Sequence, residues 1–407
     1  MDEELVEEID RHPILHWNYR GYTSVPGELK VYGTHIEEIY LKQNKLKILP
    51  DWIGSLKNLC NLYLNGNCLK DITKEVLQLK NLTVIDISDN NLDKLPDNIS
   101  DLANLIELRC DNNKLTSLPK KIGFLGALSL LSVENNFLKS LPASLGCCFS
   151  LESLNLKRNK LKTLPNNLVF LPQLDTVIIS NNQLQYLPSI SFVDKPIIDF
   201  SKNPCVNYLS YDVFSHALDP HLMKTNLSIF SYTHDTNFQN ELKKSDVIKN
   251  CNLVVEVVNW KKYASSDNNL ETLLVLPEPL KEIYDEADAR VPSLFELSLR
   301  HFYTSIPSNN RARFFCKKIN ENNLPNQLKH ILMNGPSAIC HTCRSFIFTE
   351  CVVWVIVKLI RCNICGINEI LTTVYFCKTS CARSFLTDEK NLEETLSAHK
   401  MKWTRVN

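Results

Sequence analysis

Cysteines are the side chains whose spacing most clearly predicts a chemical role in this sequence. Seven of the fifteen lie between residues 340 and 381. Six of these form three close pairs, which are Cys340 with Cys343, Cys362 with Cys365, and Cys377 with Cys381. Two thiolates separated by two or three residues can fill two corners of a tetrahedral Zn²⁺ site, and a second pair completes it. We expect a structural zinc ion, because four thiolates leave no open position for a substrate.

Two combinations of the pairs could form this site, and the sequence leaves both open. The first pair with the second would have the spacing of a zinc ribbon. The first pair with the third resembles a treble-clef finger, in which the site ends at the start of a helix. We favour the treble clef, since Cys381 would lie in the first helical turn and Phe385 would cover the metal. The apolar segment 352–359 would then be a strand of the finger's hairpin.

Composition and charge exclude several other classes of function. Lys+Arg and Asp+Glu are both 45, and this zero net charge argues against nucleic-acid binding. The longest apolar run, 351–360, contains Lys358 and is far shorter than the roughly 20 residues that span a bilayer, so we expect no membrane insertion. The acidic N-terminus lacks the apolar core of a secretory signal. We therefore expect a cytoplasmic protein, also compatible with the nucleus, whose cysteines are thiols or metal ligands.

A 23-residue repeat occupies the N-terminal half. Asparagine recurs at that spacing, at positions 44, 67, 90, 113, 136, 159 and 182. Each unit follows the frame L-x-L-x-x-N-x-L-x-x-L-P, the leucine-rich-repeat signature. The L-x-L pair turns the apolar side of a short strand inward, and the asparagine can satisfy backbone groups of neighbouring coils. We expect an α/β leucine-rich-repeat solenoid, a horseshoe of about nine coils over 13–205 behind an N-terminal helical cap at 1–12.

The concave face of such a solenoid is formed by residues beside and between the core leucines. Tyrosines and exposed aliphatic side chains among them favour a protein-binding surface over a plain solvated one. The predicted substrate-contacting residues are Tyr40, Tyr63, Val84, Asp86, Glu107, Arg109, Leu130 and Ile178. No Ser/His/Asp or paired-carboxylate arrangement can be placed on this face, so we expect a binding protein that is not an enzyme.

Residues 206–290 have no regular repeat and are expected to form an irregular bridging segment. Within it, 252–258 and 273–277 have the apolar character of strands, and 278–289 is predicted to be a charged helix. A Cys-rich zinc-binding module is expected at 338–390, followed by a C-terminal tail at 391–407.

Two short amphipathic helices are predicted between these segments, over 291–333. In the first, Pro292 and Ser293 suit a helix start. Leu294, Leu297, Ser298 and Phe302 then share one face, in which a small residue is flanked by large apolar ones. Such a face suits insertion into a partner's groove. The second helix carries Leu324, Pro325, Leu328, Ile331 and Leu332.

Together the two helices resemble a suppressor-of-cytokine-signalling (SOCS) box. The first matches the Elongin-binding pattern L-x-x-x-(C/S/A)-x-x-x-apolar, and the second matches the cullin-box tail L-P-x-x-L-x-x-Y-L with Ile331 at the tyrosine position. Two departures bear on which cullin would bind. Asn322 and Asn323 stand where another Leu-Pro is usual, and the gap between the helices is longer.

The order of parts resembles a family of leucine-rich-repeat proteins that carry a SOCS-box-like and Cys-rich C-terminal module. The resemblance covers nearly the whole chain and is most specific from 291 to 300 with the cysteine pairs after it. It implies a substrate receptor of a cullin-RING ubiquitin ligase, with Elongin B/C and cullin 5 or cullin 2 as partners and a protein substrate on the repeats. The alternative is a non-enzymatic scaffold that has no connection with ubiquitin. The Cys362 and Cys365 pair has no assigned place in this pattern.

Overall fold

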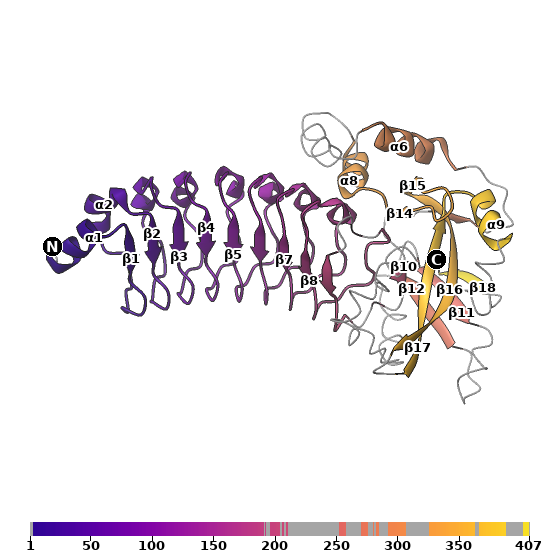
Figure 1. Ribbon diagram of the computed structural model, residues 1–407, viewed down its shortest axis with the longest axis horizontal. Coiled ribbons are helices and arrows are strands. Elements are labelled where there is room, and N and C mark those ends of the chain that lie inside the picture. Colours follow the sequence, from indigo (N-terminus) through magenta and orange to yellow (C-terminus); the bar gives the residue numbers. More distant parts are fainter. Residues whose placement is uncertain are drawn as a thin grey trace. The chain divides into compact units, whose positions relative to one another are not determined.

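The chain is divided into two compact units in the computed structural model (Figure 1). The repeat unit comprises Met1–Gln183 and Phe192–Lys202, and the C-terminal unit comprises Leu184–Ser191 and Asn203–Asn407. The structure describes residues 3–190, 192, 196–203, 206, 209–210, 252–257, 270–275, 280, 282–284, 292–306, 325–362, 366–387 and 402–406. None of the described helices is long and apolar enough to cross a membrane.

Nine short parallel strands in sequential order form the sheet of the repeat unit. They are β1 (Ile14–His16), β2 (Glu38–Tyr40), β3 (Asn61–Tyr63), β4 (Val84–Asp86), β5 (Glu107–Arg109), β6 (Leu130–Ser132), β7 (Ser153–Asn155), β8 (Thr176–Ile178) and β9 (Ile197–Asp199). The registers from β2 to β8 advance by 23 residues per strand. Helices α1 (Glu3–Arg11) and α2 (Glu28–Tyr32) belong to the N-terminal coil region. The predicted solenoid is therefore confirmed.

Short 3-10 helices return the chain opposite the strands. They are η1 (Gly33–His35), η2 (Asp51–Ser55), η3 (Lys74–Gln78), η4 (Ile99–Asp101), η5 (Lys120–Phe124), η6 (Ala143–Cys147) and η7 (Asn166–Phe170). Four of them follow the proline of the Leu-Pro motif, whose fixed φ and missing N–H suit a position just before a helix. Cys147 in η6 is disulfide-bonded, so the expectation that every cysteine is a thiol or a metal ligand is wrong there.

A ladder of buried asparagines connects successive coils. Asn113 shows the pattern, since its side-chain amide donates to the carbonyls of Ile87 and Cys110 at 3.0 and 3.1 Å. Its carbonyl oxygen accepts from the N–H of Leu92 at 2.9 Å, and Asn113 is only 5% exposed. Asn90 and Asn136 repeat these bonds one coil away. The asparagine therefore supplies hydrogen bonds that the tightly turning backbone of each coil lacks.

The residue before each ladder asparagine adopts a left-handed backbone conformation. Its φ is 54° at Asp89, 55° at Asn112 and 52° at Asn135, and Gly66 occupies the equivalent place at 74°. Asp, Asn and Gly tolerate this region better than most residues, which explains their recurrence there. Asn112 also donates to Asp89 and Asn135 to Asn112, both at 2.8 Å, so an exposed row of hydrogen bonds runs beside the buried one.

The described residues of the C-terminal unit form three sheets and three helices. One sheet has four strands in the order β10 (Leu209–Ser210), β17 (Gly366–Phe376), β16 (Glu350–Cys362) and β13 (Glu282–Tyr284). A second sheet has three strands in the order β12 (Leu270–Val275), β11 (Asn252–Val257) and β18 (Lys402–Val406). The third pairs β14 (Ala338–Ile339) with β15 (Phe346–Ile347), and the helices are α6 (Leu294–Ser305), α8 (Asn326–Asn334) and α9 (Thr379–Thr387). The antiparallel β16–β17 hairpin contains the strand predicted at 352–359.

Two predictions for this unit need correction. The helix expected over 278–289 is wrong at 282–284, where β13 pairs in parallel with β16 and thereby gains backbone hydrogen bonds that local helix propensity does not outweigh. The expected tail contains β18, which adds to β11 in antiparallel register. The strands predicted near 252 and 273 are present as β11 and β12.

Replacing Asn113 with Ala should destabilise the repeat unit. The change leaves the N–H of Leu92 and two carbonyls without their side-chain partner in the core, which costs about 1–3 kcal/mol. Chemical unfolding of the full chain should show the repeat unit's transition at lower denaturant. Lys114→Ala, at the exposed neighbouring position, serves as the matched control and should leave it in place. An equal midpoint in both variants would contradict a stabilising role for the ladder.

Candidate zinc centre and docking surfaces

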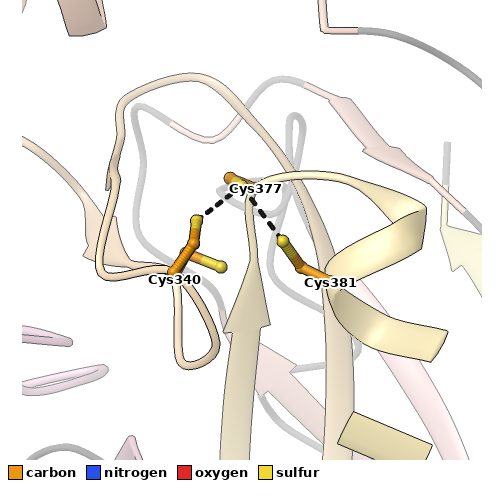
Figure 2. A group of neighbouring side chains, drawn as sticks. Cys340, Cys377 and Cys381 are labelled. Carbon is orange, nitrogen blue, oxygen red and sulfur yellow. Dashed lines mark hydrogen bonds between the residues drawn. The ribbon is translucent and has the colours of Figure 1, made fainter. Parts of the chain in front are cut away.

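Four cysteine sulfurs come together where β14, β15, β17 and α9 meet. The Sγ atoms of Cys340, Cys343, Cys377 and Cys381 all lie within 4.8 Å of one another. The Cys343 and Cys377 sulfurs are 3.3 Å apart, and those of Cys377 and Cys381 are 3.8 Å apart. Figure 2 shows the labelled thiols pointing toward one another at the start of α9. A tetrahedral ion with Zn–S bonds of about 2.3 Å requires sulfurs about 3.8 Å apart, so this spacing fits zinc.

Local backbone geometry explains why these thiols converge. Cys340 and Cys343 lie in the turn between β14 and β15, in which the N–H of Arg344 donates to the carbonyl of Cys340 at 2.9 Å. Arg344 adopts a left-handed backbone conformation with a φ of 59°, so the chain reverses tightly there. Cys377 follows β17, and Cys381 lies in the first turn of α9 as predicted. The two ligand pairs therefore come from a turn and from a strand-to-helix junction.

The electrostatics of the cluster suit a bound cation. Hydrogen bonding from the Cys377 thiol lowers the pKa of Cys340 to about 4. The same contact, together with burial, raises the pKa of Cys377 far above its ordinary value. One thiolate therefore disfavours ionisation of its neighbour when no positive charge is present. A divalent ion would stabilise all four thiolates at once, and the residues present fit zinc with a structural role.

Cys362, one residue of the alternative cysteine pair, lies at the other end of the hairpin. Cys362 is paired with Gly366 at the tip, whereas Phe376, next to the cluster, is paired with Val352. At about 3.3 Å per residue, these two ends of the hairpin are roughly 30 Å apart. Cys365 lies outside the described residues. The geometry therefore favours the treble-clef ligand set over the ribbon set.

Aromatic residues pack beside the cysteines. Phe385 of α9 is buried and lies 5.3 Å from Phe376 and 5.1 Å from His341 between ring centroids. His341 is itself between the first two cysteines in sequence. Phe385 therefore lies next to the cluster, in agreement with the covering role expected for it.

One side of helix α6 packs into the C-terminal unit. Ser293 caps it by accepting from the N–H of Glu296 at 3.2 Å, which confirms the predicted helix start. Leu299 and Tyr303 are buried in an apolar cluster with Phe348, and the Tyr303 and Phe348 rings meet edge to face at 5.4 Å. The inner side of α6 therefore holds it firmly in the C-terminal unit.

The opposite side of α6 is apolar and faces solvent. Leu294 is 81% exposed, and Phe295, Leu297 and Phe302 are 48%, 41% and 41% exposed. Ser298 is exposed among them. The four residues predicted to share a docking face thus lie together on the outer side of the helix. Exposed large apolar side chains on one helix face are typical of a protein interaction site.

Helix α8 departs from the predicted second docking surface. Ile331 and Leu332 are only 6% and 3% exposed, because they pack into the apolar cluster that also contains Leu299 and Tyr303. Their assignment to a cullin-contacting surface is therefore wrong for this structure. Pro325 is exposed and Leu328 is partly buried against the same cluster, while Leu324 lies outside the described residues.

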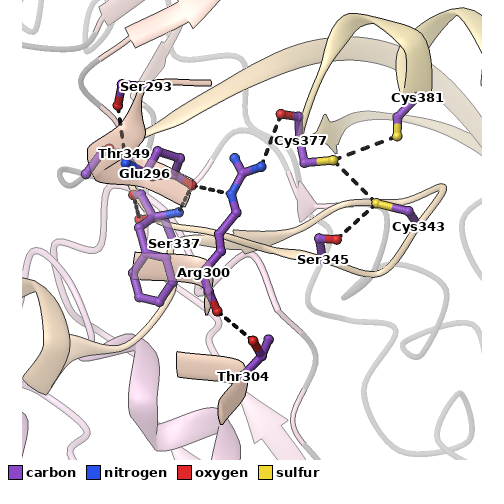
Figure 3. Close-up of polar contacts among 11 residues, drawn as sticks. Ser293, Glu296, Arg300, Thr304, Ser337, Cys343, Ser345, Thr349, Cys377 and Cys381 are labelled. Atoms are coloured by element: carbon purple, nitrogen blue, oxygen red, sulfur yellow. Dashed lines mark hydrogen bonds and ion pairs between the residues drawn. The ribbon is translucent and has the colours of Figure 1, made fainter. Parts of the chain in front are cut away.

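A buried ion pair that the sequence did not predict lies on the inner side of α6. The Nε of Arg300 donates to the Oε1 of Glu296 at 2.7 Å, and Glu296 is completely buried. Figure 3 shows Arg300 between Glu296 and Cys377, whose carbonyl accepts from the guanidinium at 3.3 Å. The only signal in the sequence was the spacing of four between an acid and a base, which is more often a solvated surface pair.

On the concave face of the repeat unit, all eight predicted substrate-contacting residues are half-buried on strands β2 to β8. Tyr40 stacks on Tyr63 at 4.4 Å and on His16 at 4.8 Å, and Lys42 lies 4.7 Å from the centroid of the Tyr63 ring. The hydrogen bond to Glu38 raises the pKa of Tyr40 to about 12. An ordered aromatic row, with Lys42 added to the predicted set, therefore covers the first strands.

Charged residues follow the aromatic row along the sheet. Arg109 pairs with Glu107 at 3.1 Å. Asp111 accepts from the Ser132 hydroxyl and from the N–H of Glu134, both at 2.6 Å, and burial raises its pKa despite these hydrogen bonds. The concave face thus changes from aromatic to charged along the sheet.

Substitution of one ligand from each candidate set should identify the zinc ligands. Cys377→Ser should reduce bound zinc well below the level of about one ion per chain expected for wild type, because it removes a thiolate from the cluster. Cys362→Ser is the matched control and should keep full zinc. Metal analysis of the purified full-length chains measures both. Loss of zinc in the Cys362 variant alone would assign the site to the ribbon pairing.

Comparison with known proteins identifies the repeats. The Leucine Rich Repeat family model matches residues 81–102, and no curated protein matches the chain. Similar solved structures include a leucine-rich-repeat protein of Leptospira interrogans (27% identity, TM-score 0.42, covering 52% of this chain and 56% of that one). An internalin of Listeria monocytogenes is 21% identical, with a TM-score of 0.41, and the match covers 52% of this chain and 58% of that one. The effector YopM of Yersinia pestis is 26% identical, with a TM-score of 0.41, and the match covers 51% of this chain and 58% of that one.

The chain thus aligns with less than two thirds of the length of each of these structures. Two other observations identify the repeats. The first is the match to the family model. The second is that strand pairing and the hydrogen bonds of the asparagine ladder both repeat every 23 residues from coil to coil. The N-terminal unit of this protein is therefore built of leucine-rich repeats.

Proposed function

We propose that this protein is the substrate-recognition adaptor of a cullin-RING ubiquitin ligase and binds Elongin B/C through helix α6. The observation that carries the proposal is the exposed apolar face of Leu294, Leu297 and Phe302, with the small Ser298 among them. Its sequence has the Elongin-binding pattern. A helix that is anchored by one side and apolar on the other suits insertion into a groove.

The energetics support a central role for Leu294. Transfer of a fully exposed leucine side chain into an apolar pocket contributes roughly 1.5–3 kcal/mol. At 81% exposure, Leu294 has nearly all of that surface to bury. Ser298, with its small side chain, would let the partner approach the helix backbone closely. These features make the outer face of α6 a compact binding epitope.

The cullin would contact the start of α8. Because Ile331 and Leu332 lie in the core, the proposed contact is limited to Leu324, Pro325 and the partly exposed Leu328. Cullin 5 or cullin 2 is the expected partner, on the resemblance to a SOCS box. Ile331 and Leu332 would then support this contact indirectly, by holding α8 against α6.

The leucine-rich repeats would hold the protein substrate on their concave face. The stacked rings of Tyr40 and Tyr63 and the nearby Arg109 support this role, since Tyr and Arg contribute disproportionately to binding energy at protein interfaces. The ligase partners would catalyse ubiquitin transfer, so the chain itself would not be an enzyme. Such an assembly would operate in the cytoplasm or the nucleus.

A scaffold without a ubiquitin link is the second candidate. The repeat unit supports it as well as the first, because a concave protein-binding surface is common to both. The two candidates differ at α6, whose exposed apolar face has no assigned partner under the scaffold hypothesis.

Leu294→Asp should abolish Elongin binding. A carboxylate in an apolar pocket loses its hydration without gaining a partner, so affinity should fall at least tenfold. Co-purification of Elongin C and a cullin with the full chain from cells measures this effect. Phe124→Asp introduces the same charge at an exposed apolar residue of the repeat unit and is the control. If wild type brings down neither Elongin C nor a cullin, the scaffold function replaces the adaptor function.

A double change of Tyr63 and Arg109 to Ala should separate substrate binding from ligase binding. Proteins whose half-lives lengthen in cells lacking this chain are candidate substrates. Wild type should restore their turnover, whereas the double variant should fail to do so while still co-purifying Elongin C. Its unfolding midpoint should stay near that of wild type, because both side chains point out of the sheet. Restored turnover by the double variant would place the substrate site on another surface.

A further inference from the structure

Glu296 occupies an unusual position for a carboxylate. It is 0% exposed, although its helix lies at the surface of the C-terminal unit. Its Oε1 accepts from the N–H of Phe348 at 2.9 Å, and its Oε2 accepts from the N–H and the hydroxyl of Thr349 at 2.8 and 2.9 Å. These contacts attach α6 to the segment between β15 and β16. A buried carboxylate is tolerated only when its hydrogen bonds and a counter-charge are all in place.

Arg300 supplies the counter-charge and extends the contact to the zinc centre. Its Nε donates to Glu296 at 2.7 Å and its Nη1 donates to the carbonyl of Cys377 at 3.3 Å. The Arg300 side chain is itself only 11% exposed. The planar group therefore connects the buried carboxylate on the docking helix with the backbone of a candidate zinc ligand (Figure 3).

The carbonyl that accepts from Arg300 belongs to Cys377, whose thiol is one of the four in the cluster. Cys377 lies at the junction between β17 and α9, and its sulfur is near those of Cys343 and Cys381. A bound zinc ion would fix this junction through two cysteines, Cys377 and Cys381. Without the ion, the acceptor for Arg300 would be held less precisely, and the buried pair would lose part of its hydrogen bonding.

We propose that Glu296 and Arg300 couple zinc binding to the docking helix, so that α6 presents its apolar face fully only when the cysteine cluster holds zinc. The part of the proposal that concerns Elongin rests on the proposed function. Both residues are positioning residues, because they lie on the inner side of α6 and act through the helix. The coupling is reciprocal by thermodynamic necessity, so Elongin binding also tightens zinc binding.

The experiment compares Elongin B/C affinity of the full chain before and after zinc removal by a chelator, in wild type and in Arg300→Lys. Zinc removal should weaken binding by wild type about tenfold, within the roughly 5- to 150-fold range of typical coupling. Lysine keeps the charge beside Glu296 but lacks the fork that donates to two acceptors. In Arg300→Lys, the effect of zinc removal should therefore shrink to less than about threefold.

Hydrogen exchange of residues 294–305 provides a readout that needs no Elongin. Zinc removal should speed exchange in these residues of wild type and have a smaller effect in Arg300→Lys, with the repeat unit as internal control. General unfolding of the C-terminal unit would affect both proteins equally, and that result would overturn the coupling. So would zinc-independent exchange in wild type. If exchange responds to zinc as expected but Elongin does not bind, the adaptor function fails and the coupling stands.

Discussion

Hydrogen bonding of the buried ladder asparagines and of the buried Glu296 carboxylate is the constraint on which the two units of this protein depend. In the repeat unit, each ladder asparagine satisfies backbone groups of its own coil and the one before it. In the C-terminal unit, Glu296 does the same for the segment at Phe348 and Thr349. A buried group without partners costs more than the net gain from one hydrogen bond. Each of these residues therefore restricts the chain to arrangements that supply all its partners.

The residues that a strand or helix buries in the core determine which of its other residues remain exposed for binding. Strands β2 to β5, β7 and β8 of the repeat unit bury their middle residue and leave the flanking two half-buried at the concave face, which is where the Tyr40 and Tyr63 rings stack. Helix α6 buries Glu296, Leu299 and Tyr303, so its remaining apolar residues face outward. Both proposed binding surfaces are thus the complements of well-packed interiors, which gives each a rigid shape before a partner arrives.

The candidate zinc centre has a comparable role between segments that are far apart in the sequence. Four cysteines from the turn between β14 and β15 and from the junction of β17 with α9 converge beside the packed rings of Phe376 and Phe385. Metal binding to such a cluster contributes directly to folding. Through Arg300, the same cluster is connected with the inner side of α6. The proposed adaptor function and the proposed metal dependence therefore share one set of contacts.

The sequence alone determined the repeat unit, because every coil makes the same local contacts with its neighbours and a period of 23 residues encodes them. It also predicted the close cysteine pairs and the apolar face of α6, both of which are short-range patterns. Tertiary structure decided what depends on distant segments. The hairpin length placed Cys362 far from the cluster, packing against α6 buried Ile331 and Leu332, and strand pairing overrode the helix expected around 283. Glu296 and Arg300 resembled a surface pair until residues 52 and more positions away supplied their partners, since burial arises from the whole fold.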